Sequence, residues 1–198
     1  MHYVQAGADR VVGIDISEKM LAVAKEENSH PNITYVRMPM EDIAELKEKF
    51  DVVVSSLAMH YVEEFDSVVK SVYELLHENG VFIFSQEHPF NTCFSGGERW
   101  TRDENGRKIY ANLSDYSVEG ERESTWFVEH VKKYHRTFSG IINGLVEAGF
   151  TIQQILEPVP TQELLAQYPE DYDLLHKPDF LLVKVRKNCK KADRNIGS

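Results

Sequence analysis

Residues 11–17 read VVGIDIS, and this stretch sets the interpretation of the rest of the chain. A short apolar run suited to a strand ends in the carboxylate of Asp15, and a helix-start signal with Ser17 in the capping position follows at once. A carboxylate at the end of such a strand can accept hydrogen bonds from both hydroxyl groups of a ribose. The stretch therefore predicts half of a nucleotide-binding site.

The length and composition of the chain favour one globular domain and argue against several kinds of partner. The 198 residues suit one globular domain, here predicted over residues 1–198, and 22 basic against 32 acidic side chains give a net charge of -10, which opposes binding to nucleic acid. Cys93 and Cys189 have no neighbours at metal-ligand spacing, so we expect neither a metal site nor a disulfide. With no leader and no apolar run near the ~20 residues that span a bilayer, we expect a cytoplasmic protein without membrane contact.

Strand-like and helix-like segments alternate along the chain, which predicts an α/β fold built on parallel strands with crossover helices. The expected strands are residues 11–14, 33–38, 50–55, 81–85, 151–157 and 180–185. The expected helices are residues 1–6, 18–28, 41–48, 65–76, 137–148 and 162–168. The nearly continuous apolar run in residues 50–55 is typical of a central strand buried on both faces. The last two strands can pair antiparallel at the edge of the sheet.

Between about residues 89 and 132 the alternation of strand-like and helix-like segments stops, and glycine-containing turns separate short segments. We interpret this region as an inserted cap and residues 187–198 as a mobile tail. The cap is rich in aromatic side chains, which suit either an apolar substrate pocket or a small satellite core.

Four segments, taken in order, resemble the class I S-adenosylmethionine-dependent methyltransferases: VVGIDISEKML at 11–21, MEDI at 40–43, FDVVVSSLAMHY at 50–61 and NGVFIFS at 79–85. Within that superfamily, EHP at 87–89, YHRT at 134–137 and AGF at 148–150 are similar to small-molecule methyltransferases. The resemblance implies a Rossmann-like, mostly parallel sheet with an antiparallel edge pair, flanking helices and a cap inserted after the fifth strand of the family. It also implies S-adenosylmethionine as cofactor and a small-molecule methyl acceptor as partner.

The resemblance implies a set of cofactor contacts in the first part of the chain. Asp15 would take the ribose hydroxyls, with Ile16 and Met20 packed beside the adenosine. Met40 would offer its backbone N–H to the adenine, with Glu41 beside it. The alternatives are structural, because an acid at a helix start is favoured by the helix dipole and residues 41–42 suit a solvated helix start.

Pro39, directly before Met40, stands where many relatives carry an acid that binds the adenine amino group, so the sequence departs from the family there.

Ser56 and Leu57 follow the strand at residues 50–55, and an open parallel sheet binds its ligands at the carboxyl ends of its strands. We therefore expect both residues to contact the cofactor.

Histidines supply the candidate general bases, since an unperturbed pKa near ~6.5 allows proton acceptance at neutral pH. We predict His60 and His88 as catalytic residues, needed only if the methyl acceptor must lose a proton. Hydrogen-bonded structural roles are the alternative for both. The predicted substrate-binding residues are Tyr61, Trp100, Trp126 and His135.

The predicted function is methyl transfer from S-adenosylmethionine to a small, partly apolar metabolite. The first strand and glycine-rich loop of the family have no room in residues 1–8, where Gly7 is the only glycine. Three explanations stay open: a sequence that starts late, which we favour, an inactive chain that acts as a binding protein, and self-association through an exposed sheet edge. A nicotinamide-dependent oxidoreductase is a further alternative, although 198 residues barely allow its substrate domain.

Overall fold

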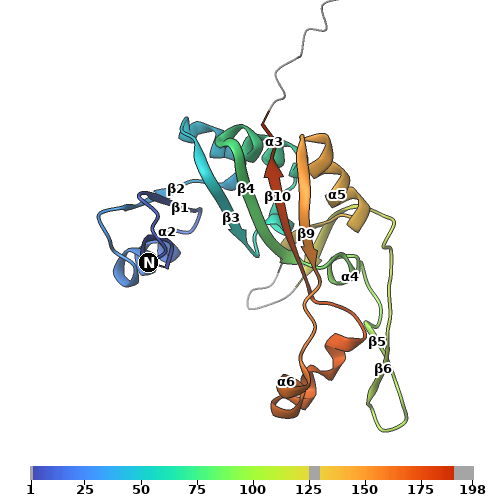
Figure 1. The fold of residues 1–198 in the computed structure, drawn as a ribbon. Helices are drawn as coiled ribbons and strands as arrows, with labels where there is room; N and C mark the ends of the chain where they lie inside the picture. The colour runs from blue at the N-terminus through green and yellow to red at the C-terminus, as the bar shows by residue number, and fades with distance from the viewer. Residues whose placement is uncertain (1, 125–129, 190–198) are drawn as a thin grey trace, which may run out of the picture. The chain divides into compact units, whose positions relative to one another are not determined.

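The structure is a computed structural model that describes residues 2–124 and 130–189. Its internal contacts divide the chain into two compact units, Met1–Lys47 and Glu48–Ser198 (Figure 1). Each unit is described by itself below. The single domain that the sequence predicts over residues 1–198 stays a prediction.

The first unit is a parallel strand pair with a crossover helix. The elements of this unit are α1 (His2–Gln5), β1 (Val11–Asp15), α2 (Glu18–Glu27), β2 (Ile33–Arg37) and the 3-10 helix η1 (Met40–Leu46). Strand β1 pairs with β2 in parallel from Val11 opposite Ile33 to Asp15 opposite Arg37. As predicted, Ser17 caps α2, because its Oγ accepts a hydrogen bond from the backbone N–H of Met20 at 3.3 Å.

The second unit contains a mixed sheet, which in the described residues has the order β3-β4-β10-β9. Its strands are β3 (Phe50–Ser56), β4 (Leu76–Glu87), β9 (Phe150–Leu156) and β10 (Phe180–Lys187). Strand β3 runs parallel to β4, and β10 runs antiparallel to both β4 and β9. The predicted antiparallel pairing of the last two strands is confirmed, with β10 inside the sheet and β9 at its edge (Figure 1).

One prediction about this sheet is wrong. Residues 50–55 were expected to form a central strand buried on both faces, but β3 is the outer strand of the four, and Val52 and Val54 are 52% and 44% exposed. The apolar run shows that the segment is a strand, whereas burial depends on what covers it. Strand β4 also begins at Leu76 rather than near residue 81, with an irregular stretch that includes the left-handed Asn79.

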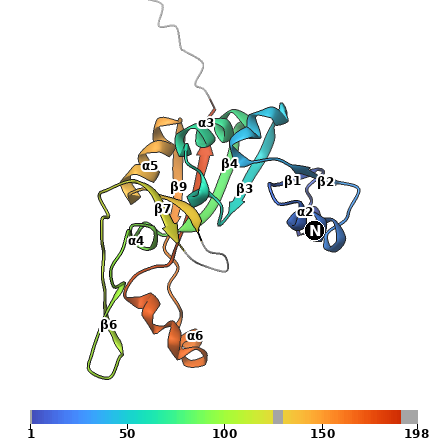
Figure 2. The same cartoon turned by 180° about the vertical axis from the view of Figure 1, so that it is seen from behind.

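Helices α3 (Phe65–Leu75) and α5 (Phe138–Glu147) pack on one face of the sheet and against each other (Figure 2). Helix α3 buries an apolar stripe on its inner face. Strand β4 contributes large buried side chains such as Phe82 and Phe84 to the same core. These elements form the core of the second unit. The fully buried members of this core include Val68, Val69, Leu145, Leu181 and Val185.

The predicted cap region forms two small sheets and short helices. One hairpin pairs β5 (Trp100–Arg102) with β6 (Lys108–Ala111), and a second antiparallel pair joins β7 (Gly120–Ser124) to β8 (Val131–His135). The remaining short helices are α4 (Pro89–Thr92), η2 (Met59–Tyr61), α6 (Gln162–Gln167) and η3 (Pro169–Leu175). The first hairpin packs against η3, because Lys108 pairs with Asp173.

The helices in residues 2–124 and 130–189 are all too short or too polar to span a bilayer. Within the same residues, no group of three or more His, Cys, Asp or Glu side chains is arranged to hold a metal ion. The tail predicted from residue 187 begins too early, because Lys187 is the buried last residue of β10, and the rest of that prediction, from residue 190 on, lies outside the described residues.

Candidate functional site

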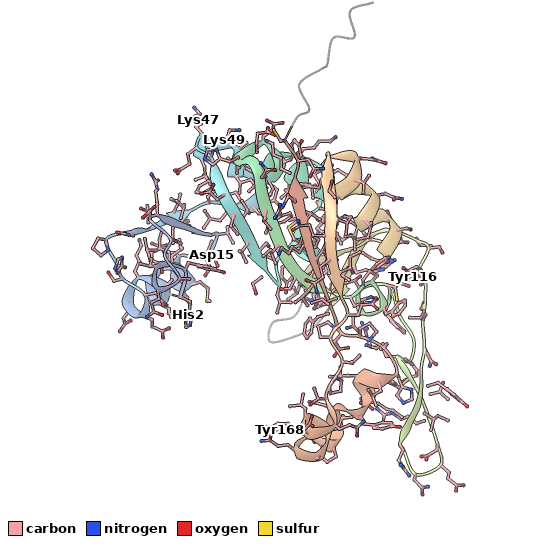
Figure 3. The ribbon with its side chains drawn as sticks, viewed as in Figure 1. His2, Asp15, Lys47, Lys49, Tyr116 and Tyr168 are labelled. Carbon is pink, nitrogen blue, oxygen red and sulfur yellow. The ribbon has the colours of Figure 1, made fainter. Side chains whose placement is uncertain are left out.

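Asp15 lies where β1 ends, at the carboxyl edge of the parallel pair (Figure 3). Its Oδ1 accepts a hydrogen bond from the backbone N–H of Ser17 at 2.7 Å, and its backbone carbonyl accepts one from Met38 at 3.1 Å. The half-buried carboxylate is therefore held in place by the turn into α2. No other residue in the described part of the chain bonds its second oxygen, so Oδ2 is open to a ligand.

Two large apolar side chains close to Asp15 in sequence are exposed. Ile16 is 66% exposed and Met20 is 58% exposed, although both side chains are large and apolar. The guanidinium of Arg37 donates to the backbone carbonyl of Ile16 at 3.2 Å and fixes the start of the turn. The site thus combines one fixed carboxylate with apolar side chains, a combination that suits a nucleoside.

Pro39 and Met40 begin the 3-10 helix that follows β2. Pro39 is the N-cap residue, with φ of -68° and an extended ψ, and Met40 is the first helical residue. Because the first N–H groups of a helix have no partner within it, the N–H of Met40 is available to a ligand. Glu41 is exposed beside it. Pro39 therefore shapes this turn but brings no carboxylate to it.

In the second unit, β3 ends in a strained turn. Leu57 has a left-handed backbone with φ of 51°, and its N–H donates to the carbonyl and Oγ of Ser85 at 2.9 and 3.1 Å. Such strain in a bulky residue is typical of functional sites. Ser56 beside it is exposed, and the Oγ of Ser55 is buried without a hydrogen-bond partner in the described residues.

His60 follows this turn on η2 and is buried at 3% exposure. Its Nδ1 accepts a hydrogen bond from the backbone N–H of Glu87 at 3.3 Å, so the ring proton of the neutral form lies on Nε2. That Nε2 faces Oε1 of Glu87 at 3.8 Å. Burial lowers the pKa of His60 to about 4, against the opposing effect of the Glu87 charge, so the ring is neutral near pH 7.

Glu87 is the last residue of β4 and gathers several groups around its carboxylate. The ammonium of Lys133, on β8, pairs with Oε1 of Glu87 and is itself buried. The ring centroids of Tyr61 and His60 lie 4.2 Å apart. Burial and then the Glu87 charge raise the pKa of Tyr61, so its phenol stays protonated. The predicted residues His60 and Tyr61 thus lie together with Glu87 and Lys133.

His88 lies apart from that cluster. Its Nδ1 accepts from the backbone N–H of Phe90 at 3.1 Å and so caps α4, and its Nε2 donates to Oε1 of Glu157 at 2.8 Å. The ring is 1% exposed, and burial lowers its pKa. Both ring nitrogens are therefore used within the fold.

His135 is likewise enclosed, with no exposed surface. Its Nε2 donates to the backbone carbonyl of Tyr116 at 2.9 Å, and its Nδ1 accepts from the hydroxyl of Thr92 at 2.8 Å. The ring ties β8 to α4 and leaves neither nitrogen open to a small molecule in this structure.

Trp100 is placed on the β5–β6 hairpin among charged side chains. The ammonium groups of Lys108 and Lys177 lie 4.7 and 5.6 Å from its ring centroid, and the ring of His176 lies at 5.9 Å. The contacts with Lys177 and His176 connect the hairpin to residues 169–179. Trp126, the other predicted aromatic substrate contact, lies outside the described residues.

The sequence analysis assigned no role to three charged residues of these clusters, Glu87, Lys133 and Glu157, although Glu87 stands in the EHP motif. The two glutamates carried a usable signal, because Glu157 ends the expected strand at residues 151–157 and Glu87 follows the one at residues 81–85 by two residues, and ligands of parallel sheets bind near such strand ends. Lys133 carried none, since a lysine in a short strand is ordinarily exposed.

Comparison with known proteins identifies the family. A family model described as "Methyltransferase domain" matches residues 1–84. An uncharacterized protein of Haemophilus influenzae is 39% identical over 195 residues, which cover 93% of this chain and 75% of that protein.

Two solved structures of S-adenosylmethionine-dependent methyltransferases are similar to this chain in both sequence and fold. An S-adenosylmethionine-dependent methyltransferase structure from Listeria monocytogenes matches with a TM-score of 0.86 and 39% identity, over 95% of this chain and 84% of that one. A second, from Mesorhizobium loti, matches with a TM-score of 0.82 and 36% identity, over 92% and 83% of the two chains.

The chain belongs to the S-adenosylmethionine-dependent methyltransferases, a family of enzymes whose cofactor is S-adenosylmethionine. The resemblance stated from the sequence motifs and the mixed α/β fold class are both confirmed. The nicotinamide-dependent oxidoreductase alternative is set aside.

Proposed function

We propose that this chain transfers a methyl group from S-adenosylmethionine to a small, partly apolar metabolite in the cytoplasm. The observation that carries the proposal is the geometry of Asp15, whose Oδ1 is fixed by the N–H of Ser17 at 2.7 Å beside the exposed apolar side chains of Ile16 and Met20. A fixed carboxylate at the end of a parallel strand fits the two hydroxyl groups of a ribose.

The remaining cofactor contacts are proposed from the same reasoning. The N–H of Met40 binds the adenine, with Glu41 beside it, because the helix start leaves that N–H without an intrahelical partner. Ser56 and Leu57 contact the cofactor from the strained turn after β3. When bound, the cofactor supplies a methyl group activated by the positive charge of its sulfonium sulfur.

The protein's own task is then to hold the acceptor in line with that methyl group and to keep water out, which can lower a barrier by ~7 to 11 kcal/mol. Tyr61 is the predicted substrate-binding residue that best suits contact with an acceptor, since it is 36% exposed beside the Glu87 cluster. A net charge of -10 favours a small molecule over nucleic acid as the partner.

Calorimetric titration with S-adenosylhomocysteine tests the proposal. The wild-type chain should bind, and Asp15→Asn should bind about tenfold more weakly, because the amide can still accept from Ser17 but loses the charged acceptor for the ribose. Asp9→Asn, an exposed acid in the same unit, is the matched control and should bind like the wild type.

Equal affinity in Asp15→Asn and wild type would remove Asp15 from the site. Failure of the wild-type chain to bind at all would overturn the proposed function and favour the alternative of an inactive chain that serves as a binding protein.

A further inference from the structure

Two histidine–carboxylate pairs lie at the carboxyl end of β4, and each contains one of the two successive residues Glu87 and His88. Glu87 faces Nε2 of His60, whereas His88 donates to Glu157. Successive side chains of an extended segment point to opposite faces, so the two pairs lie on different sides of the strand end.

The histidines of both pairs have no lone pair open to an acceptor molecule. Nδ1 accepts a backbone N–H in each ring, from Glu87 for His60 and from Phe90 for His88. In the neutral tautomer that these bonds select, Nε2 carries the proton and can only donate. Neither ring can therefore take a proton from a bound molecule without breaking a bond of the fold.

The carboxylate of Glu87 has the properties that the histidines lack. Its side chain is 22% exposed, while Lys133 and His60 both approach the same oxygen, Oε1. The second oxygen, Oε2, is used by neither of them. The hydrogen bond from Lys133 fixes the carboxylate through Oε1, with the Nε2–H of His60 facing the same oxygen at 3.8 Å, and leaves Oε2 to accept a proton or a hydrogen bond.

The position of Glu87 also connects it to the strained turn. Ser85 and Glu87 are two residues apart on β4 and share a face of the strand, and Ser85 receives the N–H of Leu57 on both its oxygens. The Glu157 carboxylate, by contrast, lies beyond β9 and is 48% exposed. Of the two carboxylates, Glu87 is the one on the side of the β3 turn.

We propose that Glu87 faces the attacking atom of the methyl acceptor and accepts its proton, with His60 and Lys133 as positioning residues. The inference rests on the proposed function and names the acceptor class: a molecule that attacks through an N–H or O–H group. The attacking atom forms a bond to the methyl carbon, the carbon–sulfur bond breaks with its electron pair kept by sulfur, and the proton passes to a Glu87 oxygen.

The test uses two cofactor analogues in place of the unidentified acceptor. S-adenosylhomocysteine lacks the methyl group, and sinefungin carries an ammonium-bearing carbon where the cofactor carries its methylated sulfur. A carboxylate facing the methyl position should bind that ammonium. Glu87→Gln should therefore weaken sinefungin by about tenfold or more, as for loss of a charge-assisted hydrogen bond, and should leave S-adenosylhomocysteine affinity within about twofold.

Three further variants separate this role from a structural one. Glu157→Gln is the matched control and should change the affinity of neither analogue. Glu87→Asp should recover part of the sinefungin affinity. Glu87→Gln removes a charged partner of the buried Lys133, so the double variant Glu87→Gln/Lys133→Met keeps the test available if the single variant does not fold, and it should show the same selective loss.

Equal weakening of both analogues, or unchanged sinefungin affinity, would overturn the role of Glu87 while the proposed function stands. If the wild-type chain binds neither analogue, the proposed function fails and this inference fails with it.

Discussion

The imidazole of His88 donates a hydrogen bond to the carboxylate of Glu157 at 2.8 Å and so joins the ends of β4 and β9, which are 69 residues apart in sequence. Because His88 is 1% exposed and also caps α4, its loss should leave a cavity and an uncapped N–H. We expect His88→Ala to lower the free energy of unfolding by about 2 to 4 kcal/mol.

Urea unfolding measures this change, and Glu157→Gln provides the comparison. The amide oxygen of glutamine can still accept from Nε2, so that variant should lose less than about 1 kcal/mol. A His88→Ala protein as stable as the wild type would show that the pair does not hold the two strand ends together.

His60 should make stability depend on pH in a defined window. Burial lowers its pKa from 6.5 to about 4, so the unfolded chain binds a proton at this site more readily than the folded one. The stabilising contribution is therefore complete above pH 6.5 and is lost as the pH falls towards about 4.

The measurement is the free energy of unfolding of wild type and His60→Gln between pH 7 and pH 4. The difference between them should shrink by about 3 kcal/mol across this window, at about 1.4 kcal/mol for each unit of pKa difference. Parallel curves for the two proteins would contradict the assignment of a neutral, buried ring.

Much of the fold could be predicted from local patterns. The strand at residues 11–14 is observed as Val11–Asp15, the helix at residues 65–76 as Phe65–Leu75, and the final two strands pair antiparallel. Apolar periodicity and capping residues fix such elements because they act within a few residues of sequence. The exposure of Val52 and Val54 was missed because it depends on what lies beside β3.

The candidate site was harder to predict for the same reason. The sequence singled out His88 and His135, but whether a ring nitrogen is open depends on partners brought by the fold, such as Glu157 and the carbonyl of Tyr116. Asp15 needed no such information, because its bond to Ser17 is local. The hydrogen-bond partners of a polar residue can thus be predicted from sequence when they are near in the chain, and not when the fold brings them from a distance.

Gly13 should tolerate no side chain. A Cβ built on Gly13 would lie 2.9 Å from Cδ1 of the Tyr35 ring on the neighbouring strand. We expect Gly13→Ala to destabilise the chain by about 1 to 3 kcal/mol, as overpacking does in other tight contacts. Gly96→Ala is the control, because its Cβ would meet nothing within 4 Å. Thermal unfolding of both variants decides the question, and equal melting temperatures would count against a close Gly13–Tyr35 contact.

Lys187, at the end of β10, holds the carboxyl end of α3. Its buried ammonium donates to the backbone carbonyls of Tyr73 at 2.8 Å and Leu76 at 3.0 Å, and it lies 4.4 Å from the centroid of the Tyr73 ring. The carbonyls at a helix end carry partial negative charge, so a cation there stabilises the helix.

Lys187→Met keeps most of the packing volume but removes both hydrogen bonds, while it also relieves the cost of burying a charge. Two hydrogen bonds from a charged donor, at about 1.5 to 3 kcal/mol each, are set against several kcal/mol for burying the ammonium, and we expect a net loss of about 1 to 2 kcal/mol in the free energy of unfolding. Arg186→Met, at the exposed neighbouring position, should change it by less than about 0.5 kcal/mol. A Lys187→Met protein more stable than the wild type in urea would mean that desolvation of the ammonium dominates at this helix end.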